Sequence, residues 1–241
     1  MAGTLYGVGL GPGDPELLTL KAHRLISTAK VISYPAPDTG TSFARAIAAG
    51  YFPDGVREIP VVIPMRESRF PAKEIYDRAA EDIADVLETG TDVITLCEGD
   101  PFFYGSYMYV FERLSERYPT VIVPGVTSLT ACAAALRRPL TSRTDVLTVI
   151  PGTLPDDDIR ARIDSAQSIA IMKVGRHVGR LRALLDDLGL TAQAGYVERA
   201  SLDEQKVLPL ADFTGDKAPY FSMILIYKGD EAWTLPPSFS S

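Results

Sequence analysis

The chain has 241 residues, of which 46% are hydrophobic and 23% charged, and these proportions are typical of a globular protein and exclude disorder as the main state. Its 24 Lys and Arg residues are outnumbered by 31 Asp and Glu residues, which gives a net charge of −7 at pH 7. This balance argues against a general nucleic-acid-binding protein, because such proteins gain their affinity mainly from cations that contact phosphates.

Cysteine and histidine are scarce in the chain. Cys97 and Cys132 lie in apolar segments and are interpreted as buried side chains. With two histidines and no CxxC spacing, a zinc site of the usual kind lacks ligands, and we expect no metal. The N-terminus has no signal-peptide pattern and no apolar run has the length of a membrane span, so the expected location is the cytoplasm.

Short apolar segments alternate with segments of helical periodicity through the first half of the chain. Asp14 and Pro15 suit the N-cap and first turn of the first helix, and residues 35–41 have the composition of a loop. The apolar segments predict strands at 4–8, 31–34, 58–63, 92–97 and 120–123. Apolar residues spaced three and four apart predict helices at 17–29, 42–49, 72–88, 106–117 and 127–136.

The second half repeats this alternation less regularly. Residues 201–217 are acidic and predicted to be irregular, and the Pro/Ser-rich tail 233–241 is predicted to be an extended arm. The predicted strands lie near 146–150, 169–174, 196–199 and 221–227, and the predicted helices near 157–164 and 177–188. A polar segment at 137–144 contains a proline, so we place a domain boundary there, between residues 1–138 and 139–241. The predicted fold is two α/β domains, each with a mostly parallel sheet flanked by helices.

Turn-rich sequences follow four of the predicted strands. They occupy residues 9–14, 99–101, 124–128 and 173–176. In open α/β sheets, ligands bind beyond the carboxyl ends of the strands, and glycine there lets a ligand approach the backbone closely. The pattern therefore predicts a ligand site lined by these loops, with four ordinary tight turns as the alternative.

The first of these loops does not fit a dinucleotide-binding fingerprint. Gly7 and Gly9 match its first two glycines, but Pro12 stands at the third position, and a start at Gly9 puts Asp14 there instead. An acidic side chain would repel a pyrophosphate, and no Walker lysine follows. A nucleotide-like ligand without phosphates suits the loops better, and S-adenosylmethionine is such a ligand.

Several longer motifs resemble one protein family over nearly the whole chain. Residues 7–22, 98–106 and 124–128 are similar to three motifs of the tetrapyrrole methylases, and residues 172–173 and 196–201 are similar to motifs of that family's second domain. The resemblance implies a two-domain fold and a homodimer. It also implies that S-adenosylmethionine is held in a cleft between the domains, mostly by backbone groups.

Within this family, two segments resemble the precorrin-2 C(20)-methyltransferases. They are residues 96–101, with Phe103 and Tyr104 after them, and residues 172–176. Uroporphyrinogen methylases usually carry a second glycine where Glu98 stands. The resemblance implies methylation of precorrin-2 at C-20, giving precorrin-3A, in cobalamin synthesis. The alternatives are methylation of the cobalt-bound ring, another methylase of this fold, and a non-catalytic nucleotide-binding protein.

Site residues are carried over from the family by position. Glu98 and Asp100 are the candidates for taking the proton that leaves the methylated carbon; a turn-capping role for Asp100 and water as the base remain alternatives. The resemblance implies cofactor contacts at Pro12, Gly99, Asp100, Phe103, Thr127, Ser128, Met172, Gly195 and Ser222.

A polycarboxylate substrate requires local cations on an acidic protein, and arginine can hold a carboxylate with two hydrogen bonds. We favour the arginines near the predicted domain boundary, and the alternative for any cluster is a solvated face. The candidate clusters are Arg66 with Arg69, then Arg137, Arg138 and Arg143, and finally Lys173, Arg176 and Arg180.

Overall fold

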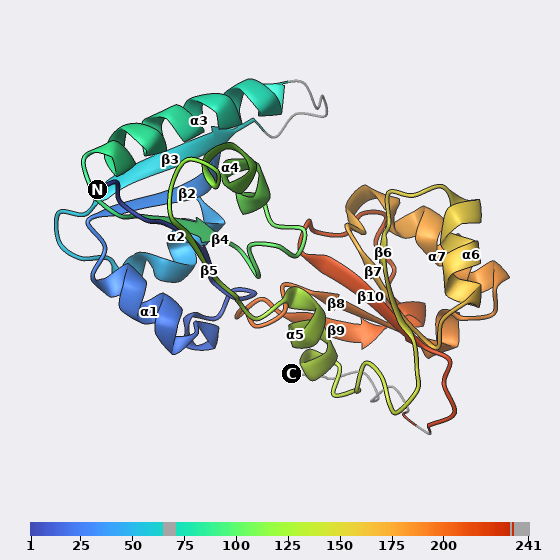
Figure 1. Cartoon of the computed structure of the whole chain (residues 1–241). Coiled ribbons are helices and arrows are strands. Elements are labelled where there is room, and N and C mark those ends of the chain that lie inside the picture. Colours follow the sequence, from blue (N-terminus) through green and yellow to red (C-terminus); the bar gives the residue numbers. More distant parts are fainter. Residues whose placement is uncertain (65–70, 232, 234–241) are drawn as a thin grey trace. The chain divides into compact units, whose positions relative to one another are not determined.

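The computed structural model describes residues 1–64, 71–231 and 233 (Figure 1). They form two compact units, Met1–Thr127 and Ser128–Ser241. The boundary expected after Arg138 falls inside the second unit. Helix α5 (Ser128–Ala135) belongs to that unit because it packs against the second unit's strands β8 and β10.

The first unit is built on a parallel sheet in the order β3-β2-β4-β1-β5, and every pair in it is parallel. This confirms the parallel arrangement expected for the first domain. The strands are β1 (Leu5–Gly9), β2 (Val31–Pro37), β3 (Arg57–Ile63), β4 (Val93–Cys97) and β5 (Thr120–Val123).

Two pairs of helices cover the two faces of this sheet, because alternate strand residues point to opposite faces. Helices α3 and α4 bury the face that carries Leu5, Val31 and Val93. The other face, with Val8 and Ile32, packs against the remaining pair. The helices are α1 (Leu20–Ser27), α2 (Phe43–Ala48), α3 (Pro71–Glu88) and α4 (Tyr107–Leu114).

The first predicted helix begins later than expected. Asp14 does cap a turn, since its carboxylate accepts a hydrogen bond from the Glu16 N–H at 2.8 Å, but this turn is a single 3-10 turn. The backbone of Leu18 is extended, with ψ of 136°, and this interrupts the helical conformation. Helix α1 then starts after a second cap, where the Thr19 hydroxyl accepts from the Ala22 N–H at 3.1 Å.

Strand β2 continues through a segment that was predicted to be a loop. It pairs with β3 along its whole length but with β4 only at Ile32 and Ser33. Pro35 and Pro37 therefore lie where β2 has β3 on one side and no ladder to β4 on the other. A proline is tolerated at such an edge because its missing N–H leaves no sheet hydrogen bond unmade.

The second unit contains a mixed sheet in the order β6-β7-β10-β8-β9. Only β6 and β7 pair in parallel, while the other three neighbouring pairs are antiparallel. The expectation of a mostly parallel sheet is corrected here at the level of strand pairing. The strands are β6 (Leu147–Pro151), β7 (Ser168–Met172), β8 (Ala194–Glu198), β9 (Lys206–Pro209) and β10 (Ser222–Tyr227).

Connection length explains this mixed pairing. Parallel neighbours need a long crossover, usually a helix, whereas antiparallel neighbours can be joined by a short turn. Helix α6 (Asp156–Asp164) joins β6 to β7, but only residues 199–205 join β8 to β9. The acidic segment 201–217, predicted to be irregular, therefore contains a strand.

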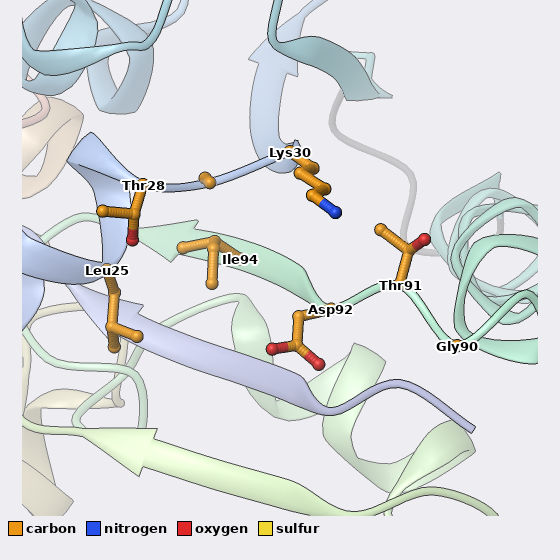
Figure 2. Close-up of a pocket in the computed structure, with 8 residues that line it drawn as sticks. Leu25, Thr28, Lys30, Gly90, Thr91, Asp92 and Ile94 are labelled. Atoms are coloured by element: carbon orange, nitrogen blue, oxygen red, sulfur yellow. The ribbon is translucent and has the colours of Figure 1, made fainter. Parts of the chain in front are cut away.

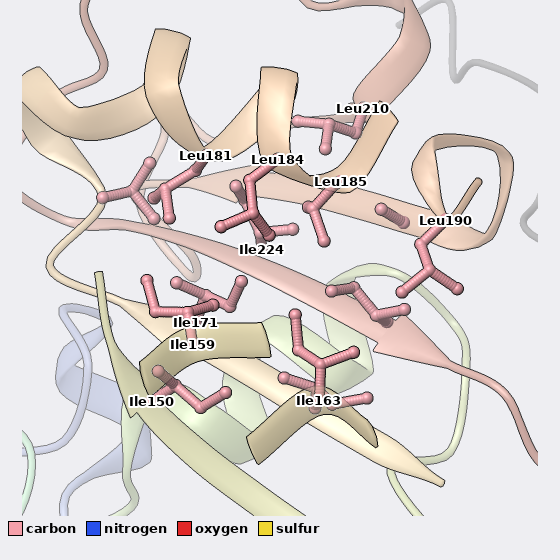
Figure 3. Packing of buried hydrophobic residues seen from close by; sticks show 14 of the residues in the cluster. Ile150, Ile159, Ile163, Ile171, Leu181, Leu184, Leu185, Leu190, Leu210 and Ile224 are labelled. Carbon is pink, nitrogen blue, oxygen red and sulfur yellow. The ribbon is translucent and has the colours of Figure 1, made fainter. Parts of the chain in front are cut away.

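The core of the second unit lies between its sheet and helices α6 and α7 (Val178–Asp187) (Figure 3). Ile159 and Ile163 of α6 and Leu181 and Leu185 of α7 are at most 1% exposed. Such burial on two helices and a sheet defines a separate hydrophobic core, so the two-domain α/β fold predicted from the sequence is confirmed. No helix among the described residues is both long and apolar enough to span a membrane.

Candidate functional site

Three of the predicted ligand loops meet at one edge of the first sheet. Strands β4, β1 and β5 are parallel neighbours, so the loops that follow them emerge side by side. Gly11 and Gly99 exchange two backbone hydrogen bonds across two of these loops, at 3.2 Å from the Gly11 N–H and 2.8 Å from the Gly99 N–H. The first and second sequence motifs are thus joined directly through their main chains.

Glycine allows the third loop to touch the other two. A Cβ at Gly125 would lie 2.0 Å from the Gly99 carbonyl oxygen, and one at Gly9 would lie 2.6 Å from the Gly125 nitrogen. Gly99 itself has a φ of +64°, in the left-handed region that favours glycine. The loops of Gly9, Gly99 and Gly125, called here the glycine loop cluster, therefore have no room for a Cβ at Gly9 or Gly125, and the backbone conformation favours glycine at Gly99.

Asp100 connects two loops of this cluster. One oxygen of its carboxylate accepts from the Phe102 N–H at 2.9 Å, and the other accepts from the Gly125 N–H at 3.0 Å. Both oxygens thus hold backbone N–H groups, as a capping residue does. The turn-capping interpretation of Asp100 is the one that this geometry supports.

Glu98, two residues before Asp100 in the chain, lies in a different environment. Burial raises the pKa of its carboxyl above the ordinary value, while the backbone N–H groups of Glu98 and Ala44 act in the opposite direction. Burial also raises the pKa of the neighbouring Cys97 thiol to about 12, so this cysteine is an inert packing group. Burial therefore makes the charged form of the Glu98 carboxyl more costly than it is in water.

The other cofactor candidates of the first unit lie in the same loops. Pro12, Phe103 and Thr127 are partly buried. The Phe103 ring packs edge-on against Tyr104, with 5.3 Å between centroids, and Tyr104 has an unusual positive φ of 56°. Non-glycine residues in that region cost energy and often mark functional loops.

In the second unit, the predicted residues lie along β10 and its two neighbours. Met172 pairs with Met223, and Gly195 pairs with Leu225, so they flank β10 two positions apart. The Ser222 hydroxyl at the start of β10 donates to the Pro219 carbonyl at 2.7 Å. Ser222 is therefore engaged in the loop that precedes its strand. Ser128 is the first residue of α5 and is partly buried.

Arg138 is not an available cation, which corrects one candidate for substrate binding. It is 5% exposed, and its guanidinium donates to the Gln193 carbonyl at 2.9 Å and to the Leu225 carbonyl at 2.7 Å. Desolvation lowers the pKa of this guanidinium to about 10. Arg138 instead joins the segment after α5 to the interior of the second unit.

The remaining basic candidates differ in their surroundings. Arg180 donates to Asp156 and to the Gly152 carbonyl. Arg143 is 85% exposed and lies 3.6 Å from Glu231. Arg66 and Arg69 lie outside the described residues. The exposed cations of the second unit that were predicted for the substrate are Arg137, Arg143, Lys173 and Arg176.

The structure adds one basic residue that the sequence analysis did not select. Arg199 is exposed at the end of β8, and Lys173 is exposed at the end of β7. Strands β7 and β8 flank β10 and run in the same direction, so both cations emerge at one edge. Both have positive φ, 51° and 56°. A cation at the end of a predicted strand, inside a family-like motif, was the signal that could have identified Arg199.

A cavity of about 210 Å³ in the first unit lies away from these loops. Figure 2 shows Lys30 and Asp92 beside it, in the segments that lead into β2 and β4. These are the amino ends of the strands, whereas the glycine loop cluster is at their carboxyl ends. The cavity is therefore not part of the candidate site.

Comparison with known proteins assigns the family. Residues 4–213 match the family model of the Tetrapyrrole (Corrin/Porphyrin) Methylases. Because the match extends over far more than half of the chain, the protein belongs to the tetrapyrrole methylases, as its motifs predicted.

Three similar proteins are named for cobalamin biosynthesis or for C(20)-methylation of precorrin-2 or cobalt-precorrin-2. The chain is 44% identical to the cobalamin biosynthesis protein CobIJ of Mycobacterium tuberculosis, over 94% of this chain but 46% of that protein, so it spans about half of that relative's length. It is 37% identical to precorrin-2 C(20)-methyltransferase of Sinorhizobium sp, over 93% of this chain and 95% of the relative. Cobalt-precorrin-2 C(20)-methyltransferase of Salmonella typhimurium is 30% identical, over 95% and 98% of the two chains.

Solved structures show the same fold. The uroporphyrin-III C-methyltransferase from Thermus thermophilus, determined in complex with S-adenyl homocysteine, has a TM-score of 0.67 and 27% identity, with 92% of this chain and 97% of that chain covered. The methyltransferase CobJ has a TM-score of 0.71 over the full length of both chains, with 20% identity.

Proposed function

We propose that this protein transfers a methyl group from S-adenosylmethionine to C-20 of precorrin-2, giving precorrin-3A. The observation that carries the proposal is the glycine loop cluster, whose exclusion of side chains leaves backbone groups at the carboxyl edge of the first sheet. A relative of this fold was determined with S-adenyl homocysteine, which supports this cofactor. The relative from Sinorhizobium sp supports precorrin-2 as the acceptor.

The proposed cofactor contacts of the first unit lie in the glycine loop cluster. Backbone and side-chain groups of the loops after β1, β4 and β5 would hold the nucleoside and amino-acid parts, with Asp100 keeping two of these loops in place. When bound, S-adenosylmethionine supplies a methyl group that is already activated by its sulfonium. The proposed contacts are Pro12, Gly99, Asp100, Phe103, Thr127, Ser128, Met172, Gly195 and Ser222.

The chemical task of the protein's own residues is to position the acceptor and to remove a proton. Holding the acceptor carbon in line with the methyl group, at about 3–3.5 Å, lowers the barrier most. The conjugated ring becomes positive as this carbon attacks, and the proton on the methylated carbon then has to leave so that the ring is neutral again. We propose Glu98 as the group that takes this proton, because burial raises the pKa of its carboxyl above the ordinary value, whereas the Asp100 carboxylate holds two loops together.

Substrate carboxylates require cations, and we propose that the second unit supplies them. Arg143, Lys173, Arg176 and Arg199 are exposed there. Arg137 is exposed as well, whereas the buried Arg138 is omitted from this set. Bidentate hydrogen bonds from such arginines would orient the ring and balance the negative charge of its carboxylates.

Glu98→Gln should lower kcat about 100-fold at pH 7, as the loss of a general base does. The affinity for S-adenosylhomocysteine should stay unchanged. In the parent protein the rate should rise with pH as Glu98 loses its proton, and this acidic limb should lie above the pH at which an ordinary glutamate titrates, because its pKa is raised. The variant should lack this limb. Steady-state kinetics of the parent and the variant between pH 5 and 8 would compare the pH dependence of their kcat values.

A matched control for this variant is Glu58→Gln in the same unit. Glu58 accepts hydrogen bonds from Arg45 at 2.7 Å and from the Tyr34 hydroxyl at 2.6 Å, at the edge strand β3. Its replacement should leave kcat unchanged. A Glu98→Gln protein with the parent's kcat and pH profile would remove Glu98 from the mechanism and leave water as the base.

The direct test of the proposed function uses S-adenosylmethionine with a heavy methyl group and enzymically made precorrin-2. We expect a product with one added methyl, which carbon NMR places at C-20. No methylation, with S-adenosylhomocysteine still bound, would retain the cofactor and reject the substrate. A failure to bind S-adenosylhomocysteine would reject both.

A second candidate substrate is the cobalt-bound ring. The relative from Salmonella typhimurium is named for cobalt-precorrin-2, and it matches nearly the whole chain. A parallel reaction with cobalt-loaded substrate separates the two, because the preferred ring has the larger kcat/KM.

We also propose a homodimer, which light scattering of the purified protein tests.

A further inference from the structure

Three buried hydroxyl groups of the first unit have no hydrogen-bond partner among the described residues. They are Ser33 Oγ on β2, Thr95 Oγ1 on β4 and the Tyr107 phenol oxygen on α4. Ser33 and Thr95 are paired in register on neighbouring strands, and Thr95 is paired with Gly7 on β1. Because residues in register point to the same face, Ser33, Thr95 and Gly7 form one row on the face that α3 and α4 cover.

Tyr107 lies directly over this row. A Cβ at Gly7 would be 2.3 Å from the Tyr107 ring carbons Cε1 and Cζ, so the ring packs where Gly7 has no side chain. Cζ carries the hydroxyl, which therefore sits above β1 beside the strand of Thr95. Tyr107 is 1% and Thr95 3% exposed. A buried hydroxyl without a partner is costly, and most such groups in folded proteins are paired with protein or with ordered water.

Two of the residues that carry these groups line a small cavity. Its volume is about 10 Å³, and its lining includes Thr95, Ser106 and Tyr107, with Val61 and Val110 closing its sides. A single buried water needs roughly 10–15 Å³ of such space and two to four polar partners. Empty cavities in proteins are apolar, whereas hydroxyl-bearing residues, Thr95, Ser106 and Tyr107 among them, belong to the lining of this one beside its apolar residues.

We propose that this cavity is the site of one buried water molecule, held between Thr95 Oγ1 and the Tyr107 hydroxyl. Thr95 precedes the loop of residues 98–106 in β4, and Tyr107 follows it as the first residue of α4. The water therefore ties together the two ends of the loop that carries Glu98, Gly99 and Asp100. This role concerns the shape of the loop and does not depend on which ligand the protein binds.

The variants Thr95→Val and Tyr107→Phe test the proposal, because each removes a hydroxyl with little change in shape. If water bridges the two groups, each variant should raise the unfolding equilibrium constant about five- to tenfold, as the loss of a buried hydrogen bond does. The double variant should raise it by less than the product of the two, because both hydroxyls act through one water. Urea unfolding measures all four proteins.

Ser33→Ala provides the matched control. Ser33 belongs to the same buried row but is not part of the cavity lining. The Ser33→Ala/Tyr107→Phe double variant should therefore change the unfolding constant by the product of the two single effects. Two outcomes overturn the proposal. One is a lower unfolding constant in Thr95→Val or Tyr107→Phe, because deleting a truly unpartnered hydroxyl removes only its burial cost. The other is a Thr95→Val/Tyr107→Phe double variant whose unfolding constant rises by the full product of the two single effects.

A crystal structure at high resolution gives an independent test that does not depend on whether the variants fold. It should show a water peak within hydrogen-bond distance of both oxygens in the parent protein. An empty cavity, or a direct hydrogen bond between Thr95 and Tyr107, would contradict the proposal.

Discussion

Gly125→Ala should lower the free energy of unfolding by about 3 kcal/mol, at the upper end of the range for overpacking a well-packed site. The new methyl group would stand 2.0 Å from the Gly99 carbonyl oxygen and 2.9 Å from the Gly9 Cα. Both obstacles are backbone atoms, which cannot rotate away as a side chain can. The three loops must therefore separate, and the Gly125 N–H must move away from Asp100.

The same separation should abolish binding of S-adenosylhomocysteine, because the proposed site is made of these loops. Urea unfolding and isothermal titration calorimetry measure the two effects. Gly50→Ala is the control, since a Cβ there meets nothing within 4 Å, and it should change neither quantity measurably. If Gly125→Ala keeps the parent's stability, the loops do not pack as tightly as the structure indicates. If it loses stability but keeps its affinity, the cofactor is held elsewhere.

Arg138→Met should lower the free energy of unfolding by about 3 kcal/mol, because hydrogen bonds from a buried charged donor are worth about 1.5–3 kcal/mol each. The guanidinium donates to two carbonyl oxygens, those of Gln193 and Leu225. A methionine side chain has no N–H group and can donate to neither of them. The side-chain length is nearly kept, so packing loss contributes little. Thermal or urea unfolding of the purified variant provides the measurement.

Arg137→Met is the neighbouring control, because Arg137 is exposed where Arg138 is buried. A surface substitution of this kind should change stability by less than about 0.5 kcal/mol. Arg138→Lys should fall between the two, since an ammonium group keeps the charge but not the planar fork that spans both carbonyls. Equal stabilities of the Arg137 and Arg138 variants would refute the structural role of Arg138.

The architecture of the first unit was largely predictable from its pattern. Strands buried on both faces appear as continuous apolar runs, of which Val93–Cys97 is the clearest, and helices between them imply parallel pairing. The details that failed are local. Leu18 adopts an extended conformation that propensity does not reveal, and Pro35 lies in a strand because β4 pairs with only part of β2.

The second unit was less predictable because strand direction is a long-range property. Residues 206–209 are too short to show a clear alternation, and nothing in their composition says that they return beside β8. The insertion of β10 between β7 and β8 pairs residues that are far apart in the sequence, such as Met223 with Met172. Such pairings depend on how whole elements pack, which local pattern does not encode.

The sequence by itself determined the family, the two-domain α/β organisation and the loops that carry the candidate site, because glycine and proline at strand ends constrain the backbone locally. Only the tertiary structure decided what individual side chains do there. It placed Asp100 between two loops, Arg138 in the interior, and Arg199 at the same sheet edge as Lys173. Charge and residue type are the same in a buried and an exposed arginine, so only burial and hydrogen-bond partners distinguish a structural cation from one that can meet a substrate.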